Sequence, residues 1–148
     1  DVLRKRLHDQ APETPLTPDA FPNAYGEDIS QIVHDEMRRH AAAALDAGYS
    51  VICDATYMTR EQRRGMEQVG EAAGVPFTGL WLDATVDKMT ARIRGRRNDA
   101  SDADETVLRS QLEADLGRID WHIIPAGGKA IETLRAAQRA LDYSDAHC

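Results

Sequence analysis

A carboxylate and a hydroxyl follow directly on a short apolar run near the middle of the chain. The run is Ser50–Tyr57, SVICDATY, and it carries Asp54 and Thr56 at its end. Helical patterns lie before and after it, so we expect a buried strand of a parallel sheet. Ligands of α/β proteins bind outside the carboxyl ends of such strands, where Asp54 could hold Mg²⁺ or order a water against a phosphate. The alternative is that Asp54 only starts a turn.

Four arginines lie close together in a second segment, Val86–Arg97, which has the apolar spacing of a helix. Arg92 and Arg96 are four residues apart, so we expect them to project from one face of that helix. Arg94 and Arg97 add a second pair. Because the planar fork of arginine matches phosphate oxygens, the segment predicts a site for a phosphate group.

An acidic segment, Asn98–Asp104, follows these arginines directly. It could neutralise them as an intramolecular salt-bridge patch, which is the alternative to a phosphate site. Ser101 and Asp104 have the spacing of a capping box that opens another helix. A basic helix, an acidic hinge and a return helix together have the form of a lid, over about residues 92–105.

A basic triplet, Arg4–Arg6, lies between Leu3 and Leu7, which are one helical turn apart. From the residues alone, we expect this triplet to lie on a solvated helix face. Asp1 suits a helix N-cap, and a chain that begins at a cap without methionine is expected to be cut from a longer protein. Residues 11–26 contain four prolines and are expected to form a loop.

The remaining patterns alternate between helix and strand. Such alternation predicts an α/β fold with right-handed crossovers between parallel strands. The expected elements are a helix over Ile29–Ala47, a helix after the capping box of Thr59 and Gln62 that ends at Gly74, strands over Phe77–Leu82 and Trp121–Ile124, and a final helix that carries Ile131, Leu134, Ala137 and Leu141.

Composition limits the class of protein. A chain of 148 residues, 42% hydrophobic and 29% charged, fits one globular domain. Its net charge of -7 argues against broad, non-specific binding of nucleic acids. Two cysteines with no metal-ligand spacing argue against a disulfide framework or a structural zinc site. No apolar run is long enough to cross a membrane, so a cytoplasmic protein is the simplest expectation.

Five segments together resemble the P-loop kinases of the AAA_33 type in order and spacing. They are Asp1–Leu7, Ser50–Tyr57 with Arg63 downstream, Arg92–Arg96, Asp99–Ala103 and Asp120–His122. The chain is similar in particular to the C-terminal kinase-like domain of bifunctional aminoglycoside phosphotransferase/ATP-binding proteins, with polynucleotide kinase and zeta toxin as more distant relatives. The resemblance covers residues 1–148 as a single domain and implies a three-layer parallel sheet of the P-loop nucleoside- and nucleotide-kinase type.

The resemblance also implies roles for individual residues. Asp1 matches the general base for the hydroxyl of the acceptor, and Arg4 and Lys5 face that acceptor. Asp54 matches a Walker-B-like position that holds or orients Mg²⁺. Thr56 and Arg63 would lie on the acceptor side, and Arg92, Arg96 and Arg97 would bind the phosphates of ATP, with Arg92 and Arg96 closing over the group that is transferred.

The family's P-loop, GxxGxGK[ST], is expected ahead of Asp1, with its strand, its helix and the second strand. Without that loop we expect the 148-residue chain to bind ATP poorly and to self-associate through exposed sheet edge. Three functions are open. They are an ATP-dependent phosphotransferase that uses Mg²⁺ and acts on a small-molecule hydroxyl, a polynucleotide 5′-hydroxyl kinase that acts on nucleic-acid ends, and a non-catalytic scaffold or regulatory remnant.

Overall fold

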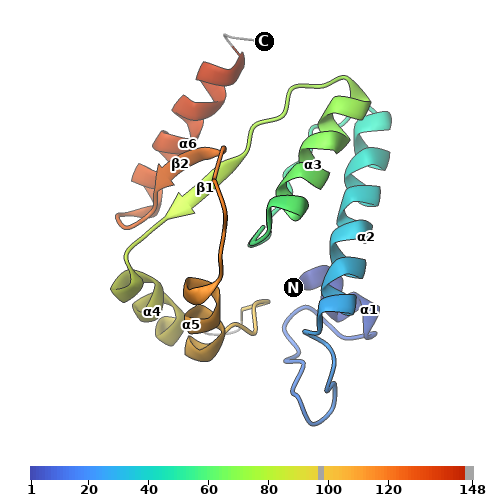
Figure 1. The fold of residues 1–148 in the computed structure, drawn as a ribbon, viewed down its shortest axis with the longest axis vertical. Helices are drawn as coiled ribbons and strands as arrows, with labels where there is room; N and C mark the ends of the chain where they lie inside the picture. The colour runs from blue at the N-terminus through green and yellow to red at the C-terminus, as the bar shows by residue number, and fades with distance from the viewer. Residues whose placement is uncertain (97–98, 146–148) are drawn as a thin grey trace.

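The computed structural model describes residues 1–96 and 99–145 (Figure 1). Three helices come before the first strand, so the predicted alternation of helices and strands holds only from the third helix onward. In chain order the elements are α1 (Val2–Leu7), α2 (Glu27–Asp46), α3 (Arg60–Ala73), β1 (Leu80–Asp83), α4 (Val86–Gly95), α5 (Glu105–Glu113), β2 (His122–Pro125) and α6 (Ala130–Asp145).

The two strands pair in parallel, with Leu80 opposite His122 and Asp83 opposite Pro125. The connection between the strands runs through α4 and α5. The helix α6 packs on β2, and α2 and α3 pack on each other, at the right of Figure 1. A mixed α/β fold with a small parallel sheet is therefore confirmed. Just before the paired strands, the Trp121 ring lies against Gly79, where an added Cβ atom would be 2.2 Å from Cγ of Trp121.

The expected strand within Ser50–Tyr57 is absent from the described residues, which corrects that prediction. Residues 51–54 belong to no helix or strand, and β1 and β2 pair only with each other. Ile52 is 96% exposed, whereas Val51 and Cys53 lie partly buried against the α2–α3 core. A strand exists only through hydrogen bonds to a neighbouring strand, and this segment has no such neighbour here.

The helix α3 begins and ends as its sequence predicts. Thr59 accepts from the N–H of Gln62, and the side chain of Gln62 accepts from the N–H of Thr59, so both bonds of the capping box are present. At the other end Gly74 has φ of +65°, the left-handed conformation that glycine adopts without strain. The helices α2 and α3 pack through a core of Met37, Ala41, Tyr57 and Met66.

The lid segment differs from expectation at both of its helix ends. α4 ends at Gly95 and Arg96 is already extended, so the helix is shorter than Val86–Arg97, and Arg97 lies outside the described residues. α5 begins after Asp104, whose carboxylate accepts from the N–H groups of Thr106 and Val107. The cap is thus Asp104 and not Ser101, because a carboxylate at this position reaches two free N–H groups of the first turn.

Candidate functional site

The first residue of the chain lies beside the lid segment. An oxygen of the Asp1 carboxylate, Oδ2, accepts from the N–H of Asp102 at 3.2 Å, and Oδ1 lies 3.6 Å from Nε of Arg4. The Asp1 carboxylate therefore contacts both α1 and the lid segment.

Arg4 is buried in the angle between α1 and the start of α2. Its guanidinium donates to the carbonyl of Ala24 at 2.6 Å and to Oγ of Ser30 at 3.2 Å. It also lies 4.8 Å from the centre of the Tyr25 ring. Burial lowers the pKa of Arg4, so these contacts are needed to keep its charge in place.

Lys5 is completely buried, with 0% of its surface exposed. Its ammonium group donates to the carbonyl of Pro12 at 2.8 Å and to Oδ1 of Asp102 at 2.9 Å. The expectation that Arg4–Arg6 forms a solvated helix face is therefore wrong for Arg4 and Lys5, because both cations have partners in segments remote in sequence. Arg6 alone of the three is exposed, as predicted.

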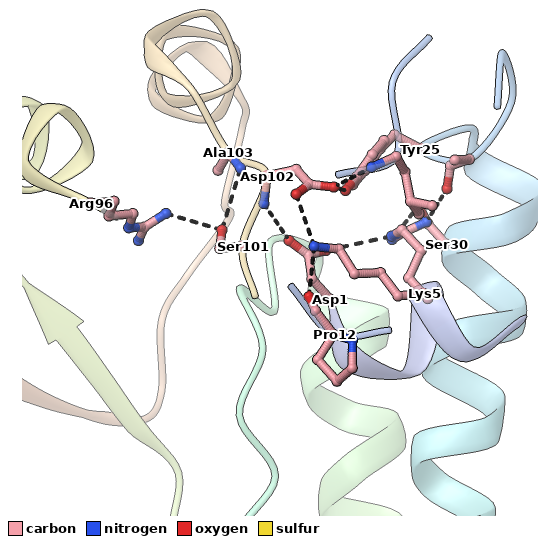
Figure 2. A network of polar contacts seen from close by, with 12 residues as sticks. Asp1, Lys5, Pro12, Tyr25, Ser30, Arg96, Ser101, Asp102 and Ala103 are labelled. Carbon is pink, nitrogen blue, oxygen red and sulfur yellow. Dashed lines mark hydrogen bonds and ion pairs between the residues drawn. The ribbon is translucent and has the colours of Figure 1, made fainter. Parts of the chain in front are cut away.

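Asp102 is the centre of this polar network (Figure 2). Its Oδ1 accepts from Lys5, while Oδ2 accepts from the N–H of Leu16 at 2.9 Å and from the hydroxyl of Tyr25 at 2.6 Å. Burial on its own would raise the pKa of Asp102, but hydrogen bonds from Leu16, Tyr25 and Lys5 outweigh it and hold the pKa below its ordinary value.

Residues 99–104, which we call the strap, connect this network to the lid arginines. Nη1 of Arg96 donates to Oγ of Ser101 at 3.0 Å, and Nε of Arg96 lies 3.7 Å from Oδ2 of Asp99. A continuous path then runs from Arg96 through Ser101 and Asp102 to Asp1 (Figure 2). The strap thus brings one lid arginine toward the acidic residue at the start of α1.

The other lid arginines lie elsewhere. Nη2 of Arg92 donates to the carbonyl of Ala126, just after β2, at 2.5 Å. Arg94 forms a two-bond ion pair with Glu105, at 2.6 and 2.9 Å. Arg92 and Arg96 therefore do not share a helix face, because α4 ends before Arg96. The Arg96–Asp99 pair is an intramolecular salt bridge of the kind that the acidic segment allowed, whereas Arg94 pairs with Glu105, just beyond that segment.

Residues 54–56 are exposed to solvent. Asp54 and Thr56 are both exposed. The described residues contain no group of three or more His, Cys, Asp and Glu side chains that could hold a metal ion. Mg²⁺ in phosphoryl-transfer sites usually takes one or two carboxylates together with phosphate oxygens and waters, so the exposed Asp54 fits as a single ligand of that kind.

Arg63 is 3% exposed, and its guanidinium is bound to backbone carbonyls rather than to a carboxylate. It donates to Tyr57 at 2.8 Å and to Leu116 at 2.6 Å, and thereby joins α3 to the segment before β2. Beside it lies a pocket of about 260 Å³. The residues that line this pocket are Arg60, Arg63, Arg64, Glu67, Arg118, Asp120 and Trp121.

Sequence patterns missed two members of the network. Tyr25 lies in the proline-containing loop and carries no signal in the sequence that would place it near the lid. Asp102 belongs to the acidic hinge, but nothing in its spacing indicates that its partner is Lys5, which is 97 residues away.

No helix among residues 1–96 and 99–145 is long and apolar enough to cross a membrane.

A comparison with family models gives one match, to the AAA domain family AAA_33, over residues 1–115. The matched region runs from Asp1 through the strap and α5. Comparisons with curated proteins and with solved structures give no match.

Proposed function

The chain belongs to the AAA_33 family of AAA domains, and from this premise we propose that it is an ATP-dependent phosphotransferase. Membership indicates a nucleotide-binding function of the P-loop kinase or ATPase type. The observation that carries the finer proposal is the path from Arg96 through the strap to Asp1. It joins a cation suited to phosphate with a carboxylate suited to accept a proton.

In the proposed reaction, the hydroxyl oxygen of the acceptor bonds to the γ-phosphorus of ATP while the bond to the β-phosphate oxygen breaks and ADP leaves. The proton of the hydroxyl passes to the carboxylate of Asp1. Arg96, with Arg92 and Arg97, stabilises the negative charge that spreads over the transferred group. Mg²⁺, when bound, would be held through Asp54 and would neutralise charge on the phosphates.

We propose a small molecule as the acceptor, in line with the similarity to bifunctional aminoglycoside phosphotransferase/ATP-binding proteins. Arg4 and Lys5 already bind other groups of the protein. Their charges are therefore not available to the acceptor, and the two residues support the wall of the site instead. Asp1 and Asp54 then leave the acceptor side acidic, which suits a neutral or cationic hydroxyl compound better than a polyanion. Thr56 is exposed beside Asp54 and available to bind it. The ATP and Mg²⁺ that the proposed reaction needs would come from the cytoplasm.

A polynucleotide 5′-hydroxyl kinase is the second candidate, and one observation favours it. The pocket beside Arg63 is lined by four arginines and Trp121, a combination that could bind a phosphate and stack a base. Two of these arginines are already paired, Arg64 with Glu67 and Arg118 with Asp120. This weakens the field that a nucleic acid would meet, and we therefore rank the small-molecule acceptor first.

Calorimetry with Mg²⁺–ATP tests the proposal, on the 148-residue chain and on the full-length gene product. We expect the full-length product to bind Mg²⁺–ATP and, in a panel of acceptors, to phosphorylate hydroxyl compounds that carry amino groups. Faster phosphorylation of 5′-hydroxyl oligonucleotides would support the second candidate instead. Absence of binding by the full-length product would overturn both and favour a non-catalytic scaffold.

A further inference from the structure

We propose that Lys5 and Asp102 form a clasp that holds the strap on α1, and that Asp102 is thereby a positioning residue for Asp1 and Arg96. The clasp itself is a statement about the fold of this chain. Its part in phosphoryl transfer rests on the function proposed above.

The burial of Lys5 is the first ground for the clasp. An ammonium group with no exposed surface must have its charge compensated inside the protein. Lys5 has the carbonyl of Pro12 and the carboxylate of Asp102, which lie at 2.8 and 2.9 Å. Asp102 is the anionic partner, so it cannot be withdrawn without leaving a buried charge that is poorly paired.

The convergence of three donors from two separate segments on Asp102 is the second ground. Its oxygens accept from Lys5 in α1 and from Leu16 and Tyr25 in the loop between α1 and α2. Asp102 is not needed to begin α5, because that helix has Asp104 as its own cap. The contacts therefore fix the position of the strap relative to α1 rather than its local conformation.

The residues next to Asp102 give the clasp its consequence for the site. The N–H of Asp102 donates to Asp1, and Ser101 accepts from Arg96 (Figure 2). Any shift of Asp102 would move the donor that orients the Asp1 carboxylate and the hydroxyl that Arg96 contacts. The Lys5–Asp102 ion pair thus fixes the position of the base, Asp1, relative to the lid arginine, Arg96. In-line transfer requires such a fixed arrangement of reacting groups.

Hydrogen–deuterium exchange on the 148-residue chain tests the clasp. We expect Asp102→Asn to speed exchange about tenfold or more in residues 11–26 and 99–104, because loss of the ion pair releases both segments. Asp104→Asn is the matched control, since asparagine removes the same charge but remains a good helix cap. Unchanged protection in Asp102→Asn, or equal loss in both variants, would overturn the clasp.

Steady-state kinetics of the full-length gene product, with Mg²⁺–ATP and water as the acceptor, tests the positioning role. We expect Asp102→Asn and Lys5→Met each to lower kcat about 30-fold or more, with KM for ATP changed less than about threefold. The double variant should be no slower than the worse single one, because the two residues act as a unit. Asp104→Asn should retain the wild-type kcat.

Two results would overturn the positioning role, and they differ from each other. A wild-type kcat in Asp102→Asn, measured where circular dichroism shows the variant to be folded, would reduce the clasp to a structural contact. A wild-type protein that turns over no ATP would overturn the proposed function and the positioning role with it. The clasp would then still be decided by the exchange experiment alone.

Discussion

Two regions of this molecule are stabilised in different ways. At the clasp, α1, the proline-containing loop and the strap meet through directional polar contacts, among them those of the Lys5 ammonium and of the Asp102 carboxylate. At the sheet, β1 and β2 pair through their backbones and leave apolar side chains uncovered: Leu82 is 58% and Ile123 is 62% exposed.

The difference teaches which region can define a site. A buried ion pair with satisfied hydrogen bonds permits one arrangement of its segments, because any other leaves a charge without a partner. An exposed apolar face has no such directional requirement and can be covered by any surface of suitable shape. The clasp therefore fixes the positions of the side chains that could take part in a reaction. The exposed part of the sheet only offers an apolar surface that another surface can cover.

Removal of the Asp102 side chain should have the largest effect on stability. Asp102→Ala leaves the buried Lys5 ammonium with the Pro12 carbonyl, and we expect a loss of about 3–5 kcal/mol in the free energy of unfolding. Urea denaturation followed by circular dichroism measures it, with Asp104→Asn as the reference. A loss below about 1 kcal/mol would mean that the clasp end is no more specific than the sheet end.

Removal of the lid arginine should leave stability nearly intact but affect turnover strongly. Arg96→Ala in the full-length gene product should lower ATP turnover by at least about 100-fold, with a smaller change in ATP affinity, because the charge acts on the transition state. Stopped assays of ADP release at saturating ATP measure kcat. Unchanged turnover would show that Arg96 has no role in the lid. The clasp would then position no residue that contacts the transferred phosphate group.

A methyl group at the strand entrance tests how tightly the sheet end is packed. Gly79→Ala places a carbon 2.2 Å from Cγ of Trp121, so the ring must shift, and we expect a cost of about 1–3 kcal/mol. Gly95→Ala is the control, because no atom lies within 4 Å of its added carbon. Thermal unfolding of the two variants gives the comparison. Equal midpoints would show that Trp121 moves away without cost.

The face of the sheet that carries the exposed Ile123 should make the 148-residue chain self-associate. Ile123→Lys introduces a charge on this face, and we expect it to shift the chain toward monomer in sedimentation velocity at tens of micromolar. Ile32→Lys provides the control, because Ile32 is 48% exposed but lies on α2. If both variants sediment like the wild type, the sheet face does not drive association.

Acid should open the clasp before the sheet, and this is the smallest of the expected effects. The pKa of Asp102 is lowered in the folded chain, so its stabilising contribution is present above the carboxyl pKa of the unfolded chain, near pH 4, and is lost as pH falls through the folded value. We expect stability measured from pH 6 to pH 3 to fall more steeply in the wild type than in Asp102→Asn. Burial lowers the pKa of His34, which costs stability nearer pH 6.5 in both proteins and cancels in their difference.

Local patterns in the sequence predicted much of the fold. The capping box of Thr59 and Gln62, the left-handed stop at Gly74 and the apolar stripe of α2 appear in the structure as expected. Such signals succeed because their partners lie within a turn or two of helix. Five short segments in fixed order also sufficed to indicate the AAA_33 family, which the family match confirms.

Contacts between distant residues were beyond those patterns. The segment 51–54 has strand composition, yet strand pairing depends on a neighbour that the described residues do not provide. The end of α4 before Arg96 separated two arginines that the helical spacing had placed together.

The sequence by itself determined most of the helices, a strand that overlaps the predicted range Phe77–Leu82 and the kinds of residue available for phosphate chemistry. Only the tertiary structure decided that Lys5 is buried, that Asp102 is its partner and that Tyr25 joins them. The physical reason is that burial of a charge depends on what surrounds it. A lysine on a short basic helix is solvated or enclosed according to segments as much as 97 residues away.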